Sequence, residues 1–69
     1  MRIGKYDVVA NVEGSHEGGF KAGVTRKWFE GGEQKELTHT VDDRIHGTME
    51  QARDHAYAHA RLQVQEGFW

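Results

Sequence analysis

Two histidines in a helical stretch are the clearest candidates for metal chemistry. His55 and His59 are four residues apart, so both imidazoles would project from one side of a helix and reach the same first-row metal ion. The glutamate that follows the first histidine of a zinc-protease helix is absent, and no spacing indicates a third ligand, although His46 or Asp43 could come near. The alternative is that the pair covers the edge of a helix–sheet contact, so we expect no bound metal or other cofactor.

Ser15 and His16 are the only adjacent residues of nucleophile and base type. Neighbouring side chains diverge, and the surrounding segment 13–19 contains three glycines. A nucleophile must instead be held within hydrogen-bond reach of an oriented base. We therefore predict a flexible loop here, no catalytic residues, and a protein that is not an enzyme.

Basic residues alternate along the predicted strands in a way that suits single-stranded nucleic acid. Lys5, Lys21, Lys27 and Phe29 would share one sheet face, where an aromatic ring can stack on a base. Acidic residues of the same face oppose this interpretation, as does the net charge of −2, from 9 basic and 11 acidic residues. Nucleic-acid binding is therefore an alternative hypothesis.

The C-terminal residues Gly67-Phe68-Trp69 place two large aromatics after the helix. Exposed together with Tyr57 and Leu62, they would form an apolar patch that marks a partner or dimer surface. Alternatively, Phe68 and Trp69 fold back and fill one end of a small core. The predicted partner-binding residues are Tyr57, Leu62, Phe68 and Trp69, together with His55 and His59.

The positions of these partner-binding residues are set by one long helix, predicted over 48–66. Thr48 followed by Gln51 has the spacing of a capping box, and Gly67 can close the helix in a left-handed conformation. A stripe of small apolar residues at helical spacing faces the sheet: Met49, Ala52, Ala56, Ala60 and Val64. Because most of them are alanine, the strands must supply the bulk of the core.

The segment before the helix alternates apolar and polar residues with the period of half-buried strands, predicted over residues 5–12, 20–29 and 34–41. Gly23 marks a bulge or a close backbone approach in the second strand. Asp42, Asp43 and Arg44 are expected to end the third strand, and Ile45 to anchor the connection to the helix. The prediction is one α+β domain over 1–69: a three-stranded antiparallel meander with one C-terminal helix packed on one face, β-β-β-α.

Length and composition bound the remaining properties. A chain of 69 residues without cysteine buries a small core and gains no stability from disulfides, so a homodimer is expected. The N-terminal MRIGKYDV lacks the apolar region of a signal peptide, and no run is long enough to cross a bilayer. We expect a cytoplasmic protein with no membrane contact.

Two short motifs carry a family resemblance. Glu17-Gly18-Gly19-Phe20 entering the second strand, and Gly47-Thr48-Met49-Glu50-Gln51-Ala52 opening the helix, resemble the partial RNase-H-like domain of HicB-type antitoxins. The resemblance implies a non-enzymatic protein that blocks a partner enzyme by occupying its surface. We therefore expect a small binding protein that docks on another protein, as an antitoxin-like or phage-type inhibitor of a host enzyme would.

Overall fold

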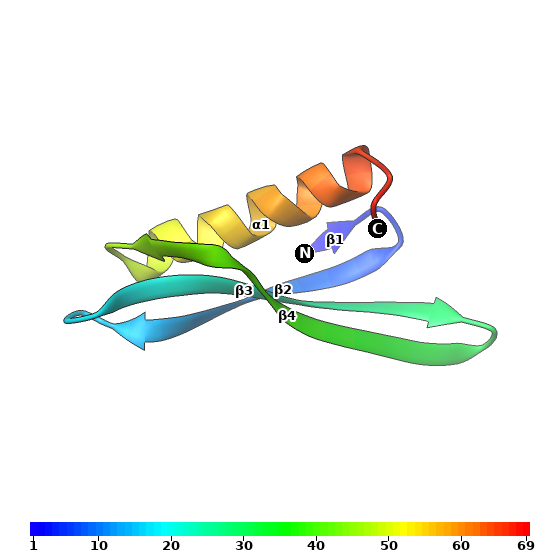
Figure 1. The fold of residues 1–69 in the computed structure, drawn as a ribbon. Coiled ribbons are helices and arrows are strands. Elements are labelled where there is room, and N and C mark those ends of the chain that lie inside the picture. The colour runs from blue at the N-terminus through cyan, green and yellow to red at the C-terminus, as the bar shows by residue number, and fades with distance from the viewer.

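The computed structural model describes residues 1–69 as a four-stranded antiparallel sheet with one helix (Figure 1). The elements are β1 (Arg2–Ile3), β2 (Tyr6–Ser15), β3 (Gly19–Glu30), β4 (Glu33–His46) and α1 (Met49–Gln65). Strand order follows chain order, β1-β2-β3-β4, and α1 lies across one face of the sheet. The predicted α+β class, with an antiparallel sheet followed by a C-terminal helix, is confirmed. The predicted number of three strands is wrong.

The additional strand is β1, which contains two residues. It turns back through Gly4, at φ +59°, and pairs Arg2 with Asp7 and Ile3 with Tyr6. The N-terminal ammonium donates to the Val8 carbonyl at 2.8 Å, and the Val8 N–H donates to the Met1 carbonyl at 2.7 Å. A two-residue strand is too short to show a period-2 pattern, so periodicity could not reveal it.

The glycine-rich segment between β2 and β3 is mostly strand rather than loop. Pairing continues to Ser15 and Gly19, which leaves a turn of three residues, 16–18. Gly14 has φ +135°, and a Cβ at this position would collide with the Gly19 carbonyl oxygen. The predicted loop therefore narrows to a tight hairpin that needs glycine for the close approach of its two strands.

β4 runs five residues past its predicted end at Val41. Thr40 pairs with Gly23 and Ile45 pairs with Lys21, so the single residue Ala22 lies opposite the four residues 41–44. The Asp42 side chain supports this large bulge by accepting the Arg44 N–H at 3.0 Å. The bulge predicted at Gly23 is present, but its extra residues belong to β4. Ile45 resumes the ladder with its side chain exposed, rather than anchoring the connection to the helix.

The helix boundaries agree with the capping pattern. Thr48 is the N-cap, and its hydroxyl accepts the Gln51 N–H at 3.1 Å. The Gln51 side chain reaches back to the Gly47 N–H at 3.2 Å. Ala52, Ala56 and Ala60 are buried as predicted, whereas Met49, expected on the same stripe, is 57% exposed. With 17 residues and a polar outer side, α1 is neither long nor apolar enough to cross a membrane.

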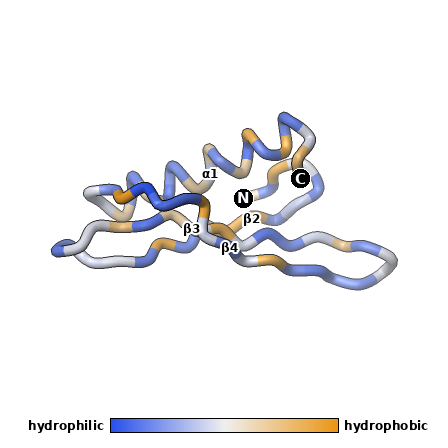
Figure 2. The backbone as a smooth tube through the Cα atoms, viewed as in Figure 1, coloured by the Kyte–Doolittle hydropathy of each residue, from blue (hydrophilic) through white to orange (hydrophobic).

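The core consists of two small clusters between α1 and the sheet, and the strands alternate hydrophobic and hydrophilic residues around them (Figure 2). One cluster packs β1, β2 and β3 residues against Ala60, and the other packs Phe20 and Ala22 against Ala52 and Ala56. Val41, in the β4 bulge, contacts both. The largest side chains that are fully buried are two valines, Val8 and Val24, so the core is thin.

This packing predicts a large effect of enlarging one alanine. Ala56→Leu should lower the free energy of unfolding by about 1–3 kcal/mol, because the added atoms have no space between helix and sheet. Ala58→Leu is the matched control, since Ala58 is exposed on the same helix and the small change in helix propensity is the same at both positions. Urea denaturation of both variants measures the difference. Equal stability of the two would show that Ala56 is not closely packed.

Candidate functional site

The C-terminal end of α1 closes with a Schellman motif. Gly67, at φ +81°, donates its N–H to the Val64 carbonyl at 3.2 Å, and Phe68 donates to the Gln63 carbonyl at 2.9 Å. The Trp69 N–H shares the Gln63 carbonyl at 3.3 Å. Gly67 therefore closes the helix as predicted. These bonds fix the backbone of both aromatic residues, so the directions of their side chains are set by the helix end.

Trp69 packs inward against the first core cluster. Its ring meets Tyr6 edge-on at a centroid distance of 5.9 Å, and His39 and His59 at 5.7 and 6.0 Å. The Arg26 guanidinium lies over the Trp69 ring at 4.3 Å, a cation–π contact. Nε and Nη1 of Arg26 are buried without hydrogen-bond partners. Trp69 thus covers a charged side chain that has no acidic partner.

Phe68, the residue before Trp69, is 72% exposed. In a Schellman motif the residue two positions after the cap commonly makes an apolar contact with the helix position four before the cap. In this chain those positions are Phe68 and Leu62, and Leu62 is 48% exposed. We call these two residues the Leu62–Phe68 pair. Of the six predicted partner-binding residues, only these two face solvent.

The other four predicted residues have partners inside the fold. The Tyr57 hydroxyl accepts the Ala10 N–H at 3.3 Å, at the outer edge of β2. His55 and His59 lie against β4, and Trp69 is in the aromatic cluster. The structure therefore does not bring the six residues together in one surface. Sequence pattern alone left open whether the two terminal aromatics share one environment, and they do not.

Four of the five histidines lie where α1 meets β4, and we call this arrangement the histidine seam: His39, His46, His55 and His59. His55 donates from Nε2 to Oδ2 of Asp42 at 2.8 Å, which ties the helix to the β4 bulge. The His46 and His55 rings are 4.9 Å apart, and the His39 and His59 rings are 6.2 Å apart. No three of the histidine, aspartate and glutamate side chains converge as metal ligands do.

Two histidines of the seam, His39 and His59, have a lowered pKa, which favours their neutral form. Burial is the main cause that lowers the pKa of His39, and the nearby Arg26 charge adds to it. Burial also lowers the pKa of His59, with a smaller contribution from His55. Nδ1 of His39 and Nε2 of His46 are buried without partners. The hydrogen bond from His55 lowers the pKa of Asp42.

The uncovered sheet face carries three of the four residues of the nucleic-acid hypothesis. Lys21, Lys27 and Phe29 lie on it, whereas Lys5 is in the β1–β2 turn with its ammonium 5.4 Å from the Tyr6 ring. Carboxylates neighbour both lysines of the face. Lys27 pairs across the strands with Asp7 and Glu36, and Lys21 pairs with Glu13. No continuous basic track therefore follows this face.

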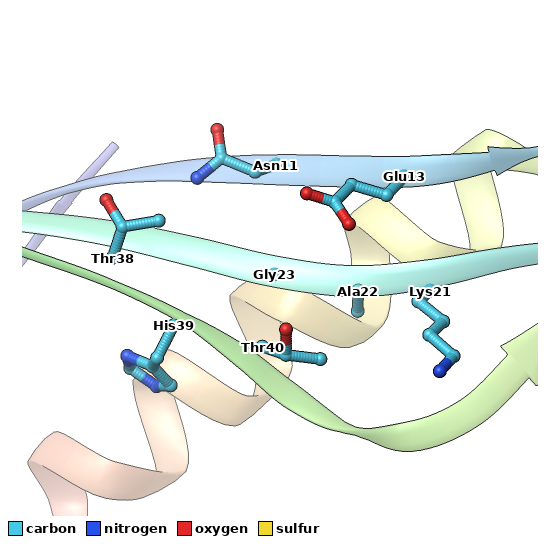
Figure 3. Close-up of a pocket in the computed structure, with 8 residues that line it drawn as sticks. All are labelled: Asn11, Glu13, Lys21, Ala22, Gly23, Thr38, His39 and Thr40. Carbon is cyan, nitrogen blue, oxygen red and sulfur yellow. The ribbon is translucent and has the colours of Figure 1, made fainter.

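A polar hollow of about 180 Å³ lies on the same face, where Gly23 has no side chain (Figure 3). Asn11 and Thr40 flank Gly23 on the adjacent strands, with Glu13 and Lys21 further along. Asn11 donates to the Thr25 hydroxyl at 2.6 Å, and Thr25 shares a 2.7 Å hydrogen bond with Thr38. These polar groups satisfy one another, and the hollow is smaller than a ligand pocket of about 300 Å³ or more.

A second hollow, which the sequence pattern did not indicate, lies between the start of α1 and β2. It has a volume of about 430 Å³ and is lined by Ala10, Val12, Met49, Glu50 and Arg53. Helical spacing placed Met49 on the buried stripe, but at the start of α1 it is 57% exposed and lines this hollow. No feature of the sequence shows how far a helix overlaps its sheet, so only the packing of α1 reveals this hollow.

The lowered pKa values of His39 and His59 predict that stability falls with acidification. A histidine whose pKa is lower in the folded state binds more protons when unfolded, so stability rises with pH up to the unfolded value near 6.5. The urea midpoint should therefore fall as pH decreases below 6.5. The pKa of Asp42 is also lowered, so its ionised carboxylate contributes to the stability of the fold. Protonation of this carboxylate at lower pH removes that second contribution.

Paired substitutions test the source of this pH dependence. His39→Gln with His59→Gln should flatten the dependence of the urea midpoint below pH 6.5, because neither position then gains a proton on unfolding. His16→Gln is the control, since His16 is exposed in the β2–β3 turn. An unchanged pH profile in the double variant would contradict the assignment to the seam.

The interrupted charge of the open face predicts weak contact with nucleic acid. Single-stranded oligonucleotides should show no binding by fluorescence anisotropy at low salt, because Asp7, Glu36 and Glu13 offset the lysines. Tight binding at low salt that weakens steeply with added salt, and that is lost on Lys21→Ala with Lys27→Ala, would instead support the nucleic-acid hypothesis.

No family model, no curated protein and no solved structure matches this chain. Its function is therefore inferred from its own surfaces. The Leu62–Phe68 pair is the part of the predicted partner-binding set that remains accessible.

Proposed function

We propose that this chain is a non-enzymatic binding module that docks on another protein through the Leu62–Phe68 pair. The single observation that supports it most is the contrast between adjacent aromatics: Trp69 is packed inward, whereas Phe68 is 72% exposed. If filling the core were the only use of the terminal aromatics, Phe68 would not need to be a large apolar residue. Its exposure on a fixed backbone suits contact with a partner.

The geometry favours binding because Phe68 needs little ordering. Two backbone hydrogen bonds, donated by Gly67 and Phe68, hold the turn. The next residue, Trp69, is held by the contact of its ring with Tyr6. An aromatic anchor that is already fixed loses less conformational entropy on association than a flexible one. Interfaces commonly centre on a few such aromatic anchors inserted in a pocket of the partner.

Exposed polar residues adjoin the pair in the chain and could form the rim of an interface. Arg61, Gln65 and Glu66 are exposed on the same last turns of α1. Polar residues of this kind surround the apolar centre of protein interfaces and supply hydrogen bonds there. The partner that fits is a protein with a small apolar pocket bordered by polar groups.

The mode of action that follows is occupation of the partner's surface. The resemblance of the Gly-Gly-aromatic entry to β3 and of the helix start to HicB-type antitoxins implies the same mode. We therefore propose an antitoxin-like or phage-type inhibitor, whose effect on an enzyme comes from covering it rather than from chemistry of its own.

A photo-crosslinking experiment tests the proposed surface. p-Benzoylphenylalanine placed at position 68 should crosslink one defined protein in cells of the native host, identified by mass spectrometry. The same probe at position 29 is the control, because Phe29 is 74% exposed but lies on the β3–β4 hairpin. No crosslinked protein at position 68, or the same set from both positions, would contradict the proposal.

Purified partner then permits a measurement of affinity. Phe68→Ala should weaken binding by about 2 kcal/mol, or roughly 30-fold in Kd, because the aromatic anchor is lost. Phe29→Ala should leave the Kd unchanged. Circular dichroism of both variants controls for the fold, and equal affinity of the two variants would remove Phe68 from the interface.

A further inference from the structure

The two edges of the sheet differ in how they are protected. The outer edge of β2 is covered by β1, by the N-terminal residue, and by Tyr57, whose hydroxyl accepts the Ala10 N–H. The outer edge of β4 has no neighbouring strand. None of the backbone hydrogen bonds outside the strand ladders and the helix involves β4. The longest strand of the sheet, with 14 residues, is therefore the unprotected one.

The regular part of this edge precedes the bulge. From Glu33 to Thr40, β4 pairs with β3 without interruption, so every second residue directs its N–H and carbonyl groups outward. Leu37 lies in the middle of this stretch and is 45% exposed. Such a row of unpaired backbone groups is a template for another strand.

We propose that this edge pairs with the same edge of a second copy, antiparallel and centred on Leu37. A two-fold axis perpendicular to the sheet then places Leu37 opposite Leu37 of the second copy. Residues that oppose each other in an antiparallel pair have their side chains on the same face of the sheet. The two-fold axis must therefore pass through a residue position and not between two neighbouring residues. The proposal concerns a different surface from the Leu62–Phe68 pair and does not depend on it.

Charge disfavours the four registers centred within two residues of Leu37. Centring on Glu36 or Lys35 would oppose two identical charges, and centring on Thr38 would oppose Glu33 and Asp43. Centring on His39 would oppose Glu36 and Asp42. With Leu37 at the centre, Lys35 faces His39 and Glu36 faces Thr38, and burial keeps His39 neutral by lowering its pKa. No like charges then meet.

The position of the helix leaves this edge accessible. α1 packs mainly on β2 and β3 and contacts β4 less. Pairing through β4 would extend the sheet to eight strands with both helices on one face, and would bring the two exposed Leu37 side chains together. Pairing with a second copy would bury additional apolar surface and so add stability, because a chain of this size with a thin core buries little apolar surface alone.

Mass and cysteine crosslinking test the proposal. Multi-angle light scattering of the wild-type protein should give twice the monomer mass of 7.9 kDa. The chain has no cysteine, so Leu37→Cys introduces a single one and should form an intermolecular disulfide on mild oxidation. Directly opposed Cα atoms are about 4.5–5.5 Å apart, within the range of a disulfide.

A matched variant tests the register. Gln34→Cys alone should not crosslink, because its two copies would be about 20 Å apart, six residues along a strand. Gln34→Cys mixed with Thr40→Cys should crosslink, since these positions oppose each other in the proposed register. Leu37→Lys should weaken dimerisation by roughly tenfold or more, because two charges then meet at the axis.

Three outcomes would overturn the proposal. They are a monomer at every concentration measured, a Gln34→Cys disulfide that forms as fast as the Leu37→Cys disulfide, and a dimer that Leu37→Lys does not weaken. Circular dichroism of Leu37→Lys is the control for an intact fold. A wild-type dimer lost on Phe68→Ala but not on Leu37→Lys would show that the copies associate at the Leu62–Phe68 pair instead.

Discussion

The close approach of α1 to the sheet is the constraint on which the rest of the structure depends. Ala52, Ala56 and Ala60 have no exposed surface, so the helix backbone lies directly over β2 and β3. Alanine permits this distance but contributes little apolar area of its own. The stability of the fold therefore depends on a small number of strand residues and on what closes the margins of the helix–sheet contact.

Each margin of that contact is closed differently. At the C-terminal end of α1, Trp69 packs on Arg26 and Tyr6. Toward β4, imidazole rings replace aliphatic side chains, and the His55–Asp42 hydrogen bond joins the helix to the bulge. Toward β2, Tyr57 reaches the strand edge. Polar and aromatic groups thus fill the positions that larger aliphatic residues occupy in a thicker core.

The arrangement of α1 on the sheet also explains why the apolar side chains of Phe68 and Leu37 are exposed. The Schellman turn directs Trp69 to the core and Phe68 away from it. The helix covers β2 and β3, which leaves Leu37 on β4 uncovered. A helix of this width cannot cover a four-stranded sheet, so apolar side chains on β4 and at the end of α1 stay exposed.

The local pattern of residues was enough to predict the helix, its caps and the antiparallel strands. Thr48, Gln51 and Gly67 act within a few residues of their own position, and the alternation that begins at Tyr6 is a property of one strand. The two errors in the predicted strands also have local causes. β1 is too short to show a period, and the residues expected to end β4 instead form a bulge that Asp42 stabilises with its own side chain.

Which of the candidate side chains are exposed was decided only by tertiary structure. His55 and His59 share a helix side, yet the positions of Asp42 and His39 on β4 give each a different neighbour. Phe68 and Trp69 are adjacent in the chain and lie in opposite environments. Sequence spacing specifies the direction of a side chain relative to its own element. Its burial depends on how elements distant in the chain are placed, and that placement comes from packing the whole molecule.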